Sequence, residues 1–167
     1  MKDLVAWKND PNRKPLIVQG IRQCGKTYLL EEFAKSYYSD YIHYRFDKDS
    51  RIKEIFDQDL NPERIIKDLS LARGKEIKPH ETLMIFDEIQ ECGSAITSLK
   101  YFYEDAPEYH IVSAGSLLGV ALKKESSFPV GKVDFLNLYP MNFYEFLFAQ
   151  NEMLADELNN ASLSNQV

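Results

Sequence analysis

Short apolar runs alternate along the chain with longer segments in which apolar residues recur at helical spacing. The run Leu16-Ile17-Val18 predicts a buried strand that ends at Gly20. From Gly25 to about Tyr38, apolar residues return every three or four positions, which predicts a helix with one buried face. A strand followed directly by a glycine-bounded turn and a helix is the first unit of the pattern.

The same alternation continues to about residue 147. Further strands are predicted at 41–46, 82–86, 109–112 and 132–138, and further helices at about 52–57, 62–72 and 95–104. A last helix is predicted after Asn142, with Phe143, Phe146 and Leu147 on one face. The strand at 82–86 is apolar almost throughout, as expected for a strand covered on both faces. This order of elements predicts an α/β domain with a parallel sheet between helices.

Length and charge restrict this picture in a few ways. With 167 residues the chain fits one domain, expected at 1–150, followed by a polar tail at 151–167. No apolar run approaches the ~20 residues of a membrane span, so we expect no membrane association and a cytoplasmic location. The net charge of −6 gives no indication of nucleic-acid binding. The two cysteines show no CxxC spacing, and His43, His80 and His110 are scattered, so each histidine is expected at the surface or a strand edge.

The turn after the first strand carries the clearest chemistry. Gly20-Ile21-Arg22-Gln23-Cys24-Gly25-Lys26-Thr27 matches the Walker A pattern, with a strand before it and a helix after it. The two glycines, Gly20 and Gly25, allow backbone N–H groups to converge on a polyphosphate, and the helix directs its positive end toward the anion. Lys26 is expected to reach the β- and γ-phosphates, and the Thr27 hydroxyl to bind Mg²⁺. The segment predicts a P-loop that holds a nucleoside triphosphate.

The remaining side chains of the loop are expected to line the nucleotide without a fixed role. Gln23 and Tyr28 are assigned to the nucleotide site by position. Arg22 can face phosphate or point outward. Cys24 lies near a helix N-terminus, where thiolates are favoured, so it is either a reactive thiol beside the nucleotide or a small residue that fills the inside of the loop.

A second motif follows the predicted strand at 82–86. Asp87 and Glu88 come directly after its apolar residues, which has the form of a Walker B segment. The carboxyl ends of parallel strands are where open α/β sheets bind ligands. We therefore expect Asp87 to bind Mg²⁺ and Glu88 to polarise the water that attacks the γ-phosphate.

At this point the chain resembles a known group, the AAA+-like ATP-binding domain of prokaryotic proteins that usually carry an additional C-terminal domain of unknown function. The resemblance covers about residues 10–150. Besides the two motifs above, it rests on the segments Ser113-Ala114-Gly115-Ser116, Phe128-Pro129-Val130-Gly131-Lys132-Val133 and Leu138-Tyr139-Pro140-Met141-Asn142-Phe143-Tyr144-Glu145-Phe146-Leu147. It implies a P-loop NTPase three-layer sandwich with a five-stranded parallel sheet in the order 5-1-4-3-2.

The resemblance also assigns residues outside the two motifs. A polar residue that ends the fourth strand is implied to sense the γ-phosphate, and here this is Ser113, with Ser116 as the alternative. Many relatives have arginine where this chain has Lys132, and an arginine there is suited to act on a neighbouring nucleotide. Lys132 lacks the planar guanidinium group that this role uses. The alternative is that Lys132 is a solvated lysine at a strand edge. Family members continue past the end of this chain, so a helical lid and the C-terminal domain are expected to be absent from it.

Two functions remain open on these residues. The first is a Mg²⁺-dependent ATPase that uses hydrolysis to drive a conformational change, with a homo-oligomer or a protein partner as the expected assembly. The second is a nucleotide-dependent switch that binds ATP and hardly hydrolyses it. A small-molecule phosphotransferase is less favoured, because an acidic pair on the third strand is more typical of hydrolysis. ATP is preferred over GTP because of the resemblance and because the chain has no Asn-Lys-x-Asp motif.

Overall fold

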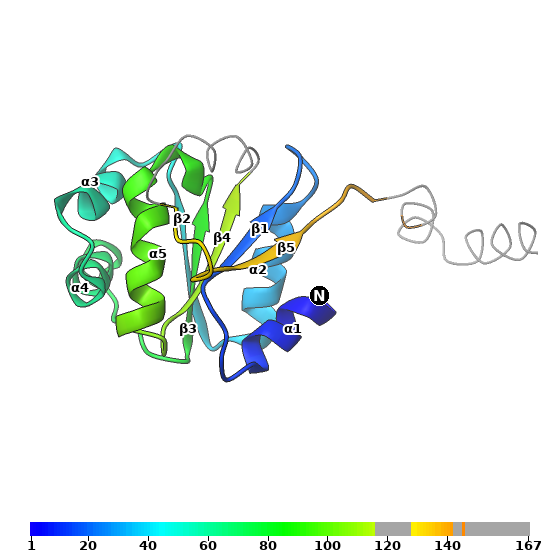
Figure 1. Cartoon of the computed structure of the whole chain (residues 1–167), viewed down its shortest axis with the longest axis horizontal. Helices are drawn as coiled ribbons and strands as arrows, with labels where there is room; N and C mark the ends of the chain where they lie inside the picture. The colour runs from blue at the N-terminus through cyan, green and yellow to red at the C-terminus, as the bar shows by residue number, and fades with distance from the viewer. Residues whose placement is uncertain (116–127, 142–144, 146–167) are drawn as a thin grey trace, which may run out of the picture.

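The computed structural model describes residues 1–115, 128–141 and 145, and it contains a three-layer α/β sandwich. In chain order the first elements are α1 (Lys2–Asn9), β1 (Leu16–Gln19), α2 (Lys26–Tyr37), β2 (Asp40–Arg45), α3 (Ser50–Gln58) and α4 (Pro62–Arg73). They are followed by β3 (Thr82–Asp87), the 3₁₀ helix η1 (Ile89–Glu91), α5 (Gly93–Asp105), β4 (His110–Gly115) and β5 (Asp134–Asn137). Figure 1 shows α1 and α2 on one face of the sheet and α3, α4 and α5 on the other.

The sheet has the predicted strand order. Its five strands pair in the order β2-β3-β4-β1-β5, and all four pairings are parallel. This is the expected order 5-1-4-3-2 read from the opposite edge. Because all strands run the same way, the loops after β1 and β3 emerge at one edge of the sheet, which we call the carboxyl edge.

Each face of the sheet has its own apolar core. On one face, Leu30 and Phe33 of α2 pack with Val18 of β1 and Ile85 of β3. On the other, Phe46, Phe56 and Phe86 form three edge-to-face ring contacts with centroids 5.5–5.7 Å apart, together with residues of α4 and α5. Both faces are therefore sealed, which explains why all six residues of β3 are buried.

The helix ends follow ordinary capping chemistry. Asp49 accepts a hydrogen bond from Arg51 N at the start of α3, and Asn61 accepts one from Arg64 N at the start of α4. Pro62 occupies the first turn of α4, where its missing N–H costs nothing.

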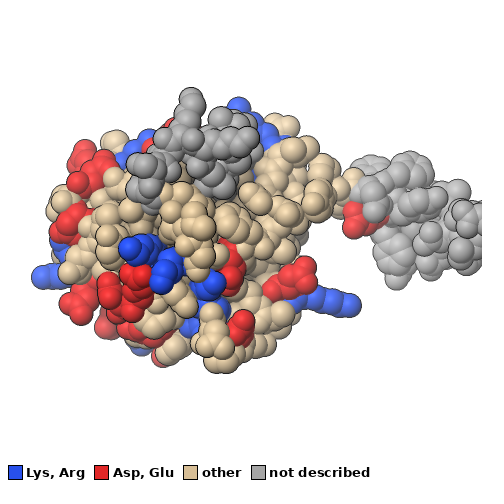
Figure 2. Space-filling view, viewed as in Figure 1, with Lys and Arg blue, Asp and Glu red and all other residues tan. Residues whose placement is uncertain are grey.

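On the face shown in Figure 2, acidic and basic side chains are interspersed.

Three elements differ from the sequence-based expectation. Helix α1 was not predicted; it packs Leu4 and Trp7 against the α2 face, and Trp7 Nε1 donates to Lys14 O at 2.7 Å. The fourth strand extends to Gly115 rather than ending at Val112, because β1 pairs with it through Gln19↔Gly115. The last strand is shorter than predicted, at 134–137. The predicted helix after Asn142 and the tail at 151–167 lie outside the described residues, apart from the single position 145.

Candidate functional site

The phosphate cradle is the loop between β1 and α2. Its last residue, Gly25, has a left-handed backbone (φ 89°, ψ 15°) and caps the N-terminus of α2. Its first residue, Gly20, lies against the chain that leaves β5: a Cβ at this position would stand 2.3 Å from Leu138 O and 2.9 Å from Cys24 Sγ. The loop therefore requires glycine at one end for its backbone conformation and at the other end for close packing.

Lys26 points back into this loop. Its side chain is almost fully buried, and Nζ donates to Gly20 O and Ile21 O, both at 2.9 Å, and lies 3.8 Å from Cys24 Sγ. A buried ammonium needs such acceptors to offset the loss of water. The loop thus holds a positive charge at the position where the β- and γ-phosphates of a triphosphate are expected.

The two predicted Mg²⁺ ligands are in direct contact. Thr27 Oγ1, on the first turn of α2, donates to Asp87 Oδ2, at the end of β3, over 2.8 Å and across 60 positions of sequence. Hydroxyl and carboxylate oxygens are the hard ligands that Mg²⁺ prefers, and it commonly binds through one or two protein oxygens, substrate phosphates and water. Among the described residues no group of three His, Cys, Asp or Glu side chains could hold a metal alone. The residues present fit a Mg²⁺ bound jointly with phosphate.

His43 joins this pair and was missed by the sequence reasoning. It lies on β2, where Nε2 is 3.4 Å from Asp87 Oδ2 and Nδ1 is 2.9 Å from Glu31 Oε1. Its hydrogen bond to Asp87 raises the pKa of His43 above the usual value, against the opposing effect of burial. Burial opposes ionisation of Asp87, but the hydrogen bonds from His43 and Thr27 hold the pKa of its carboxyl below the usual value. Asp87 is therefore an anion at neutral pH.

Glu88 follows Asp87 but does not continue the strand. Its backbone is left-handed (φ 53°, ψ 43°), which is uncommon for a residue with a side chain, and its N–H donates to Asp87 Oδ1 at 3.0 Å. Gln90 Nε2 donates to Glu88 Oε2. The turn places Glu88 in the wall of a pocket of about 340 Å³ that is otherwise lined by Arg22, Gln23, Arg45, Asp47 and Glu91. The loop and the acidic turn thus share one charged recess.

The other predicted residues of the loop lie around the cradle. Arg22 and Gln23 are exposed, and Tyr28 is 71% exposed on the first turn of α2. Gln23 has a left-handed backbone (φ 62°). Cys24 is half-buried, with its sulfur turned toward Gly20. The structure brings the whole predicted segment to the carboxyl edge of the sheet.

Ser113 does not join this group. In β4 it pairs with Ile17 and Phe86, while the next residue, Ala114, pairs with Asp87. Because side chains alternate along a strand, Ser113 shares its face with Ile17 and Phe86, the α5 side, and its fully buried hydroxyl has no described partner. Asp87 lies on the α2 side. The expected γ-phosphate sensing by Ser113 gains no support from this position, and the alternative, Ser116, lies outside the described residues.

Lys132 also lies away from the cradle. It precedes β5, at the amino edge of the sheet, where its Nζ is 3.0 Å from Glu104 Oε1 and 5.4 Å from the ring centre of Tyr103. This ion pair with α5 fits the interpretation as a partly solvated lysine at a strand edge. Any action on a neighbouring molecule stays a prediction.

His110 is buried rather than at the surface. It begins β4, and its Nδ1 lies 2.7 Å from Tyr38 Oη, at the end of α2. Burial, together with nearby positive charge, lowers the pKa of His110 to about 3, so the ring is neutral. The pair ties the far end of the P-loop helix to the sheet and has a structural role.

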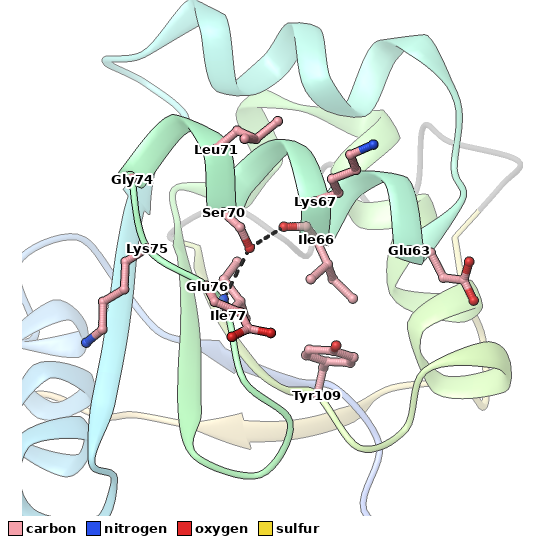
Figure 3. A pocket seen from close by; sticks show the side chains of 10 residues that line it. All are labelled: Glu63, Ile66, Lys67, Ser70, Leu71, Gly74, Lys75, Glu76, Ile77 and Tyr109. Atoms are coloured by element: carbon pink, nitrogen blue, oxygen red, sulfur yellow. Dashed lines mark hydrogen bonds between the residues drawn. The ribbon is translucent and has the colours of Figure 1, made fainter.

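A further pocket is separate from the cradle. It has a volume of about 550 Å³ and lies between α4, the 74–77 turn and Tyr109 (Figure 3). Ile77 and Tyr109 both come before strands begin, so the pocket opens near the amino edge of the sheet. Ser70 Oγ, which accepts from Ile77 N and donates to Ile66 O, holds the turn against the helix. None of its lining residues belongs to the P-loop.

With this geometry established, comparison with known proteins identifies the family. The family described as AAA domain matches residues 12–147. The chain belongs to the AAA domain family. No curated protein matches the chain. The more specific group with a C-terminal domain of unknown function is not identified by this match.

Solved structures support the fold. DnaA from Aquifex aeolicus bound to AMPPCP matches with a TM-score of 0.54 at 15% identity, over 93% of this AAA domain and 52% of that chain. Drosophila ORC bound to AT-rich DNA and Cdc6 matches with a TM-score of 0.52 at 14% identity, over 88% and 56%. At such low identity these matches show the shared P-loop NTPase fold alone. The chain spans about half the length of both.

Within the part of the chain that the structure describes, no helix has the length and apolar character needed to cross a membrane.

Proposed function

We propose that this AAA domain binds ATP together with Mg²⁺ and hydrolyses it to ADP and phosphate, using the cycle to drive a conformational change. One observation carries the proposal: the 2.8 Å contact between Thr27 and Asp87 joins the P-loop to the acidic end of β3. A loop that only turned the chain would have no need of a buried lysine and a buried carboxylate meeting a hydroxyl.

Each side chain has a place in this reaction. The N–H groups of the loop and Lys26 bind the phosphates, and Thr27 and Asp87 hold the metal ion. Bound Mg²⁺ would supply positive charge that offsets the charge of the phosphates. Glu88, in the recess beside the loop, accepts a proton from the attacking water. His43 holds Asp87 in its ionised form and fixes its orientation.

Measuring phosphate release by the Glu88→Gln variant tests the role of Glu88 as the general base. This variant keeps the size of the side chain and removes the carboxylate, so we expect ATP binding to persist and hydrolysis to fall by roughly 10²–10⁴-fold, the usual worth of a general base. Glu91→Gln makes the same change in the same pocket and should hydrolyse ATP like the wild type. If Glu88→Gln abolished binding but left turnover per bound nucleotide unchanged, the role given to Glu88 would be wrong.

Metal dependence tests the other half of the site. ATP affinity measured by calorimetry should be much higher with Mg²⁺ than with excess EDTA, because the ion neutralises charge among the phosphates and Asp87. Thr27→Val keeps the shape of the side chain but removes the hydroxyl, so it should reduce this difference. Equal affinity with Mg²⁺ and with EDTA would contradict the metal assignment.

The second function, a switch that binds ATP with little hydrolysis, is favoured by one contact. Gln90 donates to the carboxylate of Glu88, which competes with a water for that oxygen. Gln90→Ala separates the two functions: a switch held by this contact gains phosphate release, whereas an active ATPase does not. We further propose that turnover involves a second copy of the chain, in which case phosphate release per molecule rises with protein concentration.

A further inference from the structure

An arginine at the end of β2 stands beside the acidic end of β3. Strand pairing sets Arg45 directly opposite Asp87, so both side chains leave the sheet on the same face, the side of α2. Arg45 is the last residue of β2 and therefore lies at the carboxyl edge, where the P-loop emerges. Its side chain is 40% exposed, so a ligand at this edge can reach the guanidinium.

The surroundings of Arg45 are those of the charged recess. Arg45 lines the recess of about 340 Å³ together with Glu88 and two residues of the P-loop. Hydrogen bonds to Asp47 raise the pKa of Arg45. The negative charges of Asp87 and Glu88 add to this effect, so the guanidinium lies within the field of both carboxylates of the acidic pair.

In the proposed reaction, the terminal phosphate is the part of the nucleotide nearest this recess. Thr27 and Asp87 are the ligands of a metal ion that is shared with the phosphates. Glu88, in the wall of the recess, must reach the water that attacks the γ-phosphate. A cation in the same recess therefore lies in the region of the γ-phosphate, whereas ADP ends one phosphate earlier.

The present partner of Arg45 is a carboxylate that a phosphate can replace. Arg45 Nε donates to Asp47 Oδ1 at 3.2 Å, and Nη2 donates to Asp47 Oδ2 at 3.0 Å. Guanidinium groups bind carboxylates and phosphates with this same two-bond geometry. Asp47 and a phosphate would therefore compete for the same N–H groups.

We infer that Arg45 binds the γ-phosphate and lets the site distinguish ATP from ADP, an inference that rests on the proposed function. Asp47 holds the guanidinium when this phosphate is absent, and the phosphate replaces Asp47 when ATP is bound. The family resemblance placed γ-phosphate sensing at Ser113 on the fourth strand, which pairs with Phe86 and so lies on the other face of the sheet. Arg45 lies on the face of Asp87 and carries a planar cation that suits phosphate.

The ratio of ATP affinity to ADP affinity tests this role, measured by calorimetry on the full chain with Mg²⁺. Arg45→Gln should weaken ATP binding by roughly 10- to 150-fold, the usual effect of losing a hydrogen bond to a charged group, and should leave ADP binding unchanged. Arg45→Lys keeps the charge and should restore part of the preference for ATP.

The chain offers a matched control on the next turn. Arg51 pairs with Asp49 through the same two atoms, Nε to Oδ1 at 3.3 Å and Nη2 to Oδ2 at 3.4 Å. This pair lies at the start of α3, and neither residue lines the recess. Arg51→Gln should therefore change neither the ATP affinity nor the ADP affinity.

Asp47→Asn separates this role from that of a structural ion pair. If the pair only stabilised the turn, removing either partner would have the same effect. We expect opposite effects: Asp47→Asn removes the competing carboxylate and should strengthen ATP binding by roughly 2- to 5-fold, the range of an exposed ion pair. This gain should vanish in the double variant Arg45→Gln/Asp47→Asn, because the guanidinium that the substitution releases is then missing.

Three results would overturn the inference. An unchanged ratio of ATP to ADP affinity in Arg45→Gln would show that the guanidinium does not contact the γ-phosphate. An equal loss of both affinities would show that the substitution disturbs the whole site. A gain from Asp47→Asn that persists in the double variant would show that Asp47 acts by repulsion and not by holding Arg45. These results leave the proposed function intact, whereas a wild type that binds neither nucleotide would refute the proposed function and the inference with it.

Discussion

The contact between Gly20 and the segment after β5 makes a sharp prediction for Gly20→Ala. The added methyl group would lie 2.3 Å from Leu138 O and 2.9 Å from Cys24 Sγ, and the backbone oxygen cannot rotate away as a side chain could. Leu138 must therefore move, and its N–H then loses the 2.8 Å bond to Gln19 O that ends the β1–β5 ladder.

The cost is the sum of two effects. Overpacking of a closely packed site costs about 1–3 kcal/mol. The lost hydrogen bond adds about 0.5–1.5 kcal/mol. We expect Gly20→Ala to lower the free energy of unfolding by about 1.5–4.5 kcal/mol, measured by urea denaturation.

Gly25→Ala supplies the comparison within the same loop. No atom lies within 4 Å of a Cβ at that position, so its cost comes only from the left-handed backbone, about 1–2 kcal/mol. Hydrogen exchange distinguishes the two changes: the amide of Leu138 should exchange faster in Gly20→Ala and as in the wild type in Gly25→Ala. Wild-type stability together with unchanged Leu138 protection in Gly20→Ala would refute the reasoning.

Three further predictions concern the site. Lys26→Ala should weaken ATP binding by about 2–5 kcal/mol, because a desolvated charge partner of the phosphates is lost. Lys35→Ala, on the exposed side of the same helix, should leave ATP binding unchanged. Equal ATP affinities of Lys26→Ala and the wild type in calorimetry would contradict the assignment of Lys26. In EDTA, the free energy of unfolding of the wild type should fall relative to that of His43→Gln as the pH rises from about 6.5 through the raised pKa of His43. The reason is that a pKa raised in the folded state stabilises the fold only while the ring is protonated. Parallel pH profiles of stability for the two proteins would count against the pair with Asp87. Iodoacetamide should modify Cys24 more slowly when Mg²⁺ and ATP are bound. Buried Cys92, whose pKa is raised by burial, should react slowly with and without nucleotide. If the labelling rate of Cys24 does not depend on nucleotide, the alternative that Cys24 is a small residue packed inside the loop is favoured.

The sequence predicted the parts of the site that depend on local pattern. The P-loop and the acidic pair each lie within one strand and the turn after it, so spacing and residue type were enough to find them. The strand order followed from the family resemblance, and pairing in the structure confirmed it.

The parts that were missed depend on register between distant segments. His43 reaches Asp87 only because β2 pairs with β3 so that His43 stands opposite Ile85 and on the same face as Asp87. The sequence signal for His43 was the alternation His43-x-Arg45 on the strand before the acidic pair. That alternation shows that both side chains lie on one face of the sheet, but it shows that Asp87 shares this face only when the strand pairing is known. Ser113 was assigned from its expected place at the end of a strand, whereas β4 runs two residues further and the register with Ile17 and Phe86 places Ser113 on the face opposite Asp87, so its role stays a prediction. Helix α1 has only eight residues, and its apolar residues are consecutive at positions 4–7, so no helical spacing marks it in the sequence.

The position of Trp7 determines which structural changes its fluorescence can report. It is the single tryptophan of the chain, it lies at the amino edge between α1 and the sheet, and its indole N–H is bonded to Lys14 O. Its ring is in edge contact with His110, which in turn is bonded to Tyr38 at the end of α2. Nucleotide at the opposite edge is too far away to quench the indole by contact. A change in tryptophan fluorescence when ATP is added would therefore be a signal of movement passed along α2, whose first turn bears Lys26 and Thr27.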